Sequence, residues 1–268
     1  MMTSYRAVDP SLRRSFDADE VHVQLTNAGV ASAVVIQAIN CKEETAFLLD
    51  IAGRHDWICG VVGWLPLMRP REVEVALEQL AADPEFVGVR HLINSEPDAD
   101  WIIQPAVLDS LALIAERGLP FDLVAVVPRH LEHVPALIDH VPDLRLVIDH
   151  LGKPPIREGK VEPWRSVLAR AAEHPNVYGK ISGLTTIVDR TTRTAFDIGP
   201  YVGVALELFG PQRLMFGSDW PVALLSGDYA LVWRETLKSL ESLVKADRDA
   251  ILETTARAFY LGNQRGAC

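Results

Sequence analysis

The sequence is short of basic residues, and this shortage excludes two classes of partner. Its 268 residues include 26 lysines and arginines against 36 aspartates and glutamates, a formal net charge of -10 at pH 7. Binding to nucleic acid usually requires a basic patch, and an acidic chain is repelled by anionic membrane surfaces. We therefore expect no nucleic-acid partner and no membrane partner.

Cysteine and long apolar runs are also scarce. The three cysteines, Cys41, Cys59 and Cys268, form no Cys-x-x-Cys pair. An odd number of scattered cysteines disfavours a disulfide framework or a structural zinc knuckle and favours free thiols in a reducing compartment. The N-terminal residues do not read as a signal peptide, and the longest apolar stretches fall far short of the roughly 20 residues of a membrane-spanning helix. We expect a cytoplasmic protein.

Short apolar runs alternate with amphipathic segments along the chain. Buried parallel strands read as continuous apolar runs, and they need helical crossovers between them. The pattern predicts a first helix over 17–28, with Asp17 as N-cap and Glu20 completing a capping box. It predicts strands at 33–36, 58–65, 86–93, 120–127, 144–151, 176–184 and 213–220. Helices are expected near 43–53, 71–82, 105–117, 129–140, 163–173 and 197–208, and two more near 228–243 and 246–260.

This alternation of strands and helices favours an α/β fold, and a (β/α)8 TIM barrel is the best fit. No GxGxxG follows the first strand and no GxxxxGK[ST] occurs, so a dinucleotide or P-loop site has no support. No linker divides the chain, and we expect one domain over residues 1–268 with an irregular segment at 1–15. Because the chain opens on a helix and shows seven strands, we expect the barrel to lack its first strand.

Polar residues at the ends of predicted strands are the candidates for chemistry, because barrel enzymes place their active sites there. Asp219 stands where the last strand ends and suits a general base or a metal ligand, although a turn aspartate is as common. His150 follows Asp149 at the end of 144–151. It suits a metal ligand or an electrophile, or else a histidine hydrogen-bonded beneath a loop.

Three further basic residues are weaker candidates. Arg90 suits bidentate binding of a carboxylate, or a salt bridge to a neighbouring strand. Lys180 needs a partner if it is buried, which a polar lumen would supply. His130 follows the strand at 120–127, where solvated first-turn residues are common. No His-x-His or HExxH spacing occurs, so a self-contained zinc motif is absent.

Five segments together resemble the amidohydrolase superfamily: GVRHLINSEPD, FDLVAVVPRHL, LRLVIDHLGKPPI, NVYGKISGL and RLMFGSDWPV. They are most similar to its sugar-lactonase branch, with fuconolactonase-like, rhamnonolactonase-like and 2-pyrone-4,6-dicarboxylate lactonase-like members. The resemblance runs from about Phe16 to Tyr260. Its most specific part is DHLGKP followed by GSDWPV, each at a strand end.

The resemblance implies a (β/α)8 barrel that hydrolyses a small lactone. It makes Asp219 the catalytic residue that activates water and His150 its catalytic partner, and both are candidate ligands of one divalent metal, commonly zinc. Some relatives use no metal, so the cofactor stays open. Arg90, Lys180 and Trp220 fall in segments that resemble the substrate side, and His130 joins them as a candidate substrate-binding residue. The polar segment 185–198 corresponds to a loop over the site.

The sequence departs from the family at one place. The family begins with a strand that carries His-x-His, and this chain lacks it. A gene start assigned at a downstream Met accounts for this best, ahead of a shortened expressed piece or a real loss of the site. We therefore expect this chain to be weakly active or inactive.

Two alternatives to a lactone hydrolase remain open from the sequence. One is a metal-dependent decarboxylase of aromatic or unsaturated acids within the same superfamily. The other is a truncated, non-catalytic barrel that serves as a remnant or an interaction protein. Assembly into a homo-oligomer is also left open.

Overall fold

Seven parallel strands form one curved sheet. The computed structural model describes residues 9–187 and 197–262. The strands are β1 (Ala33–Ile36), β2 (Ile58–Gly63), β3 (Phe86–His91), β4 (Phe121–Leu123), β5 (Leu146–Ile148), β6 (Val177–Ile181) and β7 (Leu214–Phe216). Each strand pairs with the next in chain order, from β1 to β7. Within the described residues no strand joins β7 to β1, so the sheet is an open half-barrel of the TIM-barrel type, as the sequence predicts.

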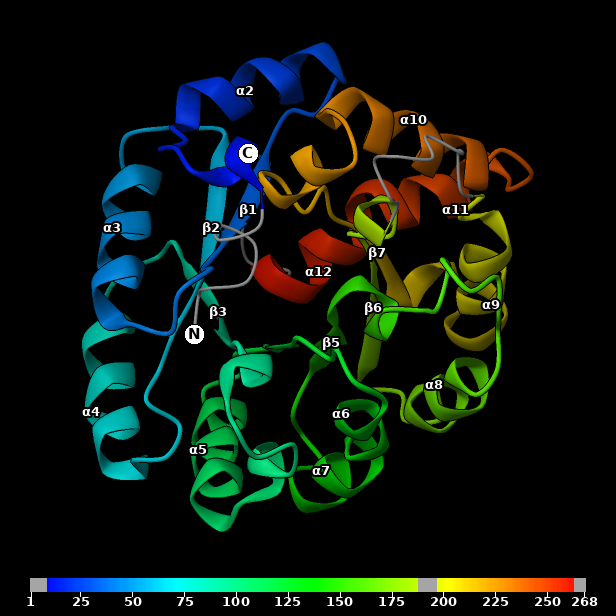
Figure 1. Cartoon of the computed structure of the whole chain (residues 1–268). Coiled ribbons are helices and arrows are strands. Elements are labelled where there is room, and N and C mark those ends of the chain that lie inside the picture. The colour runs from blue at the N-terminus through cyan, green and yellow to red at the C-terminus, as the bar shows by residue number, and fades with distance from the viewer. Residues whose placement is uncertain (1–8, 188–196, 263–268) are drawn as a thin grey trace.

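Helices cover the outside of this sheet, except the last one, which packs against its inner face (Figure 1). They are α2 (Ala18–Asn27), α3 (Lys42–Ala52), α4 (Pro70–Leu80), α5 (Pro105–Glu116), α6 (Pro128–Glu132), α7 (Val134–His140), α8 (Trp164–Ala172), α9 (Gly199–Phe209), α10 (Tyr229–Ser239), α11 (Lys245–Asp249) and α12 (Thr255–Leu261). None of the helices in the described ranges is long and apolar enough to cross a membrane.

Several strands end earlier than expected, with β4, β5 and β7 stopping at Leu123, Ile148 and Phe216, and three expectations about helices need correction. The helix expected over 129–140 is two helices, because Pro135 lacks the N–H that would bond back to the preceding turn. The last helix is interrupted by a π-helical turn over Ala250–Thr254. Asp17 does cap α2, accepting a hydrogen bond from the Glu20 N–H at 2.8 Å, but the Glu20 carboxylate pairs with Arg14 instead of completing a capping box.

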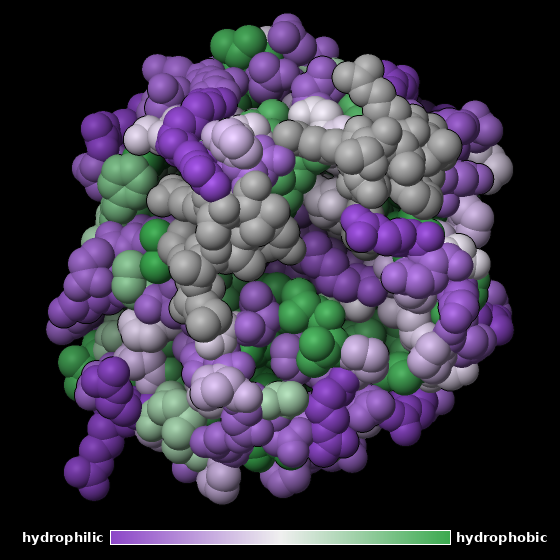
Figure 2. Space-filling model, in the orientation of Figure 1, coloured by the Kyte–Doolittle hydropathy of each residue, from purple (hydrophilic) through white to green (hydrophobic). Residues whose placement is uncertain are grey.

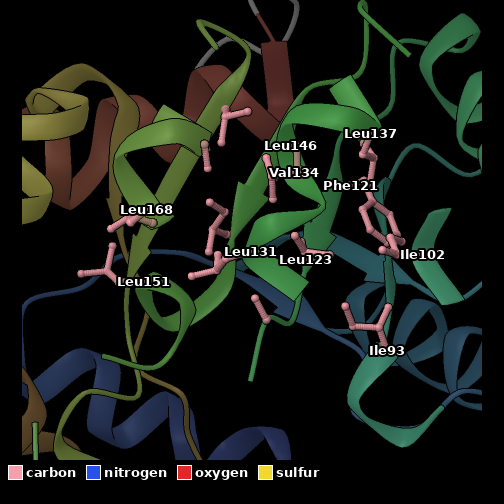
Figure 3. Packing of buried hydrophobic residues seen from close by; sticks show 14 of the residues in the cluster. Ile93, Ile102, Phe121, Leu123, Leu131, Val134, Leu137, Leu146, Leu151 and Leu168 are labelled. Carbon is pink, nitrogen blue, oxygen red and sulfur yellow. The ribbon is translucent and has the colours of Figure 1, made fainter. Parts of the chain in front are cut away.

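The main apolar core lies between the sheet and its outer helices. Figure 3 shows side chains of α6 and α7 pointing toward side chains of β4 and β5. The exposed fraction is 2% or less for Phe121, Leu123, Leu131, Val134, Leu137 and Leu146. Burying such a side chain contributes about 1.5–3 kcal/mol. This layer therefore holds the strands, and with them the strand ends, in place.

The C-terminal helix α12 packs against the inner face of the sheet. Phe259, Tyr260 and Leu261 form one buried cluster with strand residues that include Val147 and Met215. In Figure 1 this helix, drawn in red, lies within the ring of the other helices and close to β7. The Tyr260 hydroxyl donates to the two carboxyl oxygens of Asp122 on β4, at 2.8 and 2.9 Å. One end of the interior is therefore filled by the chain's own helix.

We predict that Tyr260→Phe lowers the free energy of unfolding by about 1–3 kcal/mol, because it removes a buried donor to a carboxyl group. Tyr178→Phe is the matched control. Its ring lies 4.7 Å from Phe259 in the same cluster, and its hydroxyl makes no hydrogen bond within the described residues. Urea unfolding measures both variants. Equal losses of stability would contradict the role given to the Tyr260 hydroxyl.

Candidate active site

The backbone after β5 turns in an uncommon way and directs His150 to the edge of the sheet. Four consecutive residues have positive φ: His150 at 55°, Leu151 at 50°, Gly152 at 68° and Lys153 at 56°. For residues other than glycine this left-handed conformation costs about 1–2 kcal/mol each. Two hydrogen bonds hold the turn: Lys153 N–H donates to the His150 carbonyl at 2.9 Å, and Trp164 Nε1 donates to the Leu151 carbonyl at 2.7 Å.

His150 faces Asp219, which follows β7. The imidazole Nε2 lies 3.8 Å from Asp219 Oδ1, and Nδ1 lies 2.8 Å from the Ser182 hydroxyl oxygen. Asp219 also has positive φ, at 55°. Its Oδ2 is buried and has no hydrogen-bond partner within the described residues. A buried carboxylate oxygen without a partner is costly, so it is well suited to accept a proton or bind a ligand.

Burial sets the protonation of the imidazole. Burial lowers the pKa of His150, the nearby Asp219 carboxylate opposes this, and the Lys153 ammonium lowers the pKa further. The net effect is a lowered pKa, so the imidazole is neutral at neutral pH. A neutral imidazole has one N–H donor and one acceptor nitrogen. Ser182 occupies Nδ1, and Nε2 is left for Asp219 or for a bound molecule.

Gly183 makes room for this pair. A Cβ atom at this position would lie 2.7 Å from Asp219 Oδ2 and 2.7 Å from His150 Nδ1. The residue also has φ of +60°, which glycine adopts without strain. Both observations require glycine here, because any side chain would collide with the two polar groups.

A cavity of about 400 Å³ lies beside His150 and Asp219. Its wall combines apolar side chains, such as Phe16 and Val124, with polar ones. The polar or charged lining residues are Asn40, Arg90, Asn94, Ser95, His150, Lys153 and Asp219. Figure 2 shows hydrophilic residues over most of the rim of this view, with a group of hydrophobic residues near its middle. A mostly apolar pocket with a few converging polar groups fits a small organic molecule.

A buried ion network lies next to the cavity wall. Lys180 Nζ is 2.7 Å from Asp122 Oδ2 and 2.6 Å from Asp149 Oδ1. Arg90 pairs with the other oxygen of Asp149 at 3.0 Å and also donates to the Gln37 carbonyl. Burial alone would raise the pKa of Asp149, but the charges of Lys180 and Arg90 outweigh it and lower that pKa. The network thus fixes the position of the Arg90 side chain at the cavity wall.

The structure brings three of the predicted site residues to one cavity: His150, Asp219 and Arg90. The other three predicted residues do not line it. Lys180 is 5% exposed and is held by its two carboxylate partners. Trp220 packs edge-on against Phe16, with ring centroids 5.2 Å apart.

His130 is the third of these residues. It is 4% exposed and receives a hydrogen bond from the Val126 N–H at 3.4 Å. The expected loop over the site, 185–198, falls largely outside the described residues.

Four residues of this region are not predicted from the sequence: Asp122, Lys153, Ser182 and Tyr260. Asp122 stands alone in the apolar run FDLVAVV, and a charged residue in a buried strand is a signal that it has a partner. Lys153 and Ser182 lie within two of the segments that carry the family resemblance. Tyr260 carries no signal, because an aromatic residue on the apolar face of a helix usually belongs to the core.

The described residues form only part of a metal centre. Protein zinc sites use three or more protein ligands. His150 Nε2 and the unpartnered Asp219 Oδ2 fit as two donors. Over 9–187 and 197–262, however, no group of three or more His, Cys, Asp or Glu could hold a metal ion. These residues therefore do not make up a complete zinc site.

Comparison with known proteins gives consistent matches. The amidohydrolase family model matches residues 5–261. An L-fucono-1,5-lactonase of Burkholderia ambifaria is 37% identical over 230 residues, which is 84% of this chain and 78% of the relative. An L-fucono-1,5-lactonase of Burkholderia multivorans is 34% identical over 260 residues, 93% of this chain and 87% of the relative. The crystal structure of an amidohydrolase from Burkholderia multivorans with bound zinc has a TM-score of 0.86, at 30% identity, and covers 97% of this chain and 95% of that one.

We predict that mild acid destabilises the fold. Burial lowers the pKa of His91, His130 and His150. These histidines are neutral in the folded chain, whereas the unfolded chain binds protons below a pKa of about 6.5. Stability is therefore fully present above that pKa and is lost as pH falls toward the lowered values, by up to about 1.4 kcal/mol per pH unit for each histidine.

Urea unfolding at about pH 7.5 and pH 5.5 measures this loss of stability. His130→Gln removes one of the three groups and should make the loss smaller. His140→Gln, at an exposed position, should leave it unchanged. A stability that does not depend on pH over this range would contradict the lowered pKa values, because the folded and unfolded chains would then bind equal numbers of protons.

Proposed function

Because the chain belongs to the amidohydrolase family, we propose that it is a hydrolase that opens small, sugar-derived lactones by attack of water on the ring ester carbonyl. The observation that carries this proposal is the His150–Asp219 pair, 3.8 Å apart, at the wall of the 400 Å³ cavity. The curated relatives named L-fucono-1,5-lactonase support a sugar lactone as the substrate class.

In this reaction Asp219 is the general base. Its Oδ2 has no other partner within the described residues and accepts a proton from the attacking water. We assign the Ser182 hydroxyl, 2.8 Å from His150 Nδ1, as the donor in this contact, which places the proton of the neutral imidazole on Nε2. That N–H orients the water or donates to the oxygen that gains charge. Each such acid–base or hydrogen-bonding contribution is worth about 10²–10⁴ in rate.

Of the remaining candidates, one contacts the substrate and the others support the residues of the cavity wall. Arg90 reaches the cavity and holds a hydroxyl or ring oxygen of the substrate. Lys180 acts indirectly, because it fixes Asp149, which in turn fixes Arg90. Trp220 and His130 support the cavity wall from outside. If one divalent metal were bound, as zinc is in the related structure, His150 and Asp219 would be two of its ligands and Nε2 would then carry no proton; we assign no step to a metal.

Asp219→Asn should abolish lactone hydrolysis, since an amide cannot take a proton from water. With this chain we expect a slow rate on sugar lactones, above that of buffer alone, and a rate at least about 100-fold lower for the variant. Asp139→Asn makes the same change at an exposed position and should keep the wild-type rate. A pH-indicator assay at high enzyme concentration measures acid release. Equal rates for wild type and Asp219→Asn would refute the assignment.

The same assay separates the alternatives. A parallel panel of 2-hydroxybenzoates and muconate-type acids, followed by release of carbon dioxide, tests for a decarboxylase. Turnover of that panel with no lactone hydrolysis would replace our proposal by the decarboxylase. No turnover of either panel would favour a non-catalytic barrel.

Gly183→Ala should inactivate the site without unfolding the protein. The added methyl group would fill the space between His150 and Asp219, and misplacing catalytic groups by about 1 Å costs about 100-fold in rate. Gly118→Ala is the matched control: it has φ of +66°, but nothing lies within 4 Å of the added atom. Both variants should stay folded in thermal unfolding, with the larger loss of stability in Gly183→Ala because only its methyl group meets neighbouring atoms. Full activity of Gly183→Ala would contradict the proposed site.

A further inference from the structure

Three cationic side chains lie at or behind the cavity wall, and two of them are neutralised. Lys180 is held between Asp122 and Asp149, at 2.7 and 2.6 Å. Arg90 pairs with Asp149 at 3.0 Å. Lys153 lines the same cavity, and no carboxylate of the described residues lies within ion-pair distance of it. Its positive charge is therefore available to a bound molecule.

The backbone holds Lys153 in a strained conformation on the same side as His150. Its N–H donates to the His150 carbonyl at 2.9 Å, so the two residues close one left-handed turn. Residues three apart in a helical turn lie on one face, and both of these side chains line the cavity. Glycine is the residue that adopts a φ of 56° without strain. A lysine in this position is the kind of strain that collects at functional sites.

The cavity combines the Asp219 carboxylate, the His150 imidazole and a cation that has no carboxylate partner among the described residues. Hydrolysis of an ester carbonyl needs a base for the water and a positive group for the carbonyl oxygen.

We infer that Lys153 is a further catalytic residue, whose ammonium group faces the carbonyl oxygen of the bound lactone and stabilises the negative charge that develops there. The inference rests on the proposed lactone hydrolysis and adds a group to it. Arg90 is less suited to this task, because Asp149 already offsets its charge.

The reaction balances with Lys153 protonated throughout. The water oxygen bonds to the carbonyl carbon, Asp219 takes one water proton, and the carbonyl π pair moves to the oxygen that Lys153 faces. When the carbonyl re-forms, the ring C–O bond breaks and the leaving oxygen takes the proton from Asp219. The new carboxylic acid releases its proton to solvent, and its carboxylate stays paired with Lys153 until the product leaves.

Lys153→Met, which keeps side-chain length and removes the charge, tests the inference. With L-fucono-1,5-lactone we expect kcat to fall by about 100-fold or more, as when an oxyanion donor is removed, and KM to stay within about threefold. Lys153→Arg should recover at least about a tenth of the wild-type kcat, since it restores the positive charge. Lys160→Met makes the same change at an exposed position and should behave as wild type. A kcat for Lys153→Met within about threefold of wild type, or a loss confined to KM, would overturn the inference.

A binding measurement keeps this test independent of turnover. Absence of hydrolysis by the wild-type chain would count against the proposed function, whereas binding of the open-chain acid of L-fucono-1,5-lactone still reports on Lys153. Calorimetry should show an affinity for this acid at least about tenfold weaker in Lys153→Met than in Lys160→Met, because a charge pair with the carboxylate is lost. Equal affinities would overturn the inference.

Discussion

The structure depends on the mutual neutralisation of four interior charges, three of them buried (Asp122, Lys180 and Asp149) and one, Arg90, partly exposed at the cavity. Removing one partner of a buried ion pair is strongly destabilising, because the other charge is left uncompensated. These residues come from β4, β6 and β3 and from the position directly after β5, so their pairing ties the inner faces of four strand units together. Asp149 directly precedes His150. The network that stabilises the interior therefore also fixes where the left-handed turn begins.

This polar network lies between two different environments inside the half-barrel. α12 contributes an apolar cluster with Val147 and Met215, and its Tyr260 reaches the network through Asp122. Arg90 reaches the cavity from the other side of the same network. One network of hydrogen bonds and ion pairs therefore joins α12 to the cavity-lining side chain of Arg90. A change that displaces α12 is expected to displace Arg90 as well.

The strands and the two central site residues were predictable because local signals determine them. Apolar runs mark β1 to β7, and Asp219 and His150 stand where two of those runs stop. The role of Lys180 was not predictable, since its partner Asp122 lies 58 residues away and only the barrel topology brings the two together. Tyr260 and Asp122 are 138 residues apart. Contacts between residues so far apart in the sequence decide whether a lysine in a strand binds a substrate or a neighbouring carboxylate. The periodicity of apolar residues carries no information on such contacts.

Backbone strain links the fold to the chemistry. Within the described residues four non-glycine residues have positive φ: His150, Leu151, Lys153 and Asp219. Three of them line the cavity, and the fourth lies between two of those three. Each costs about 1–2 kcal/mol, and a domain is stable by only about 5–15 kcal/mol in total. In a barrel without chemistry this strain would lower stability and gain nothing. In the proposed hydrolase the same strain directs a carboxylate, an imidazole and an ammonium group toward one cavity, which is where strained backbone collects in proteins with a functional site.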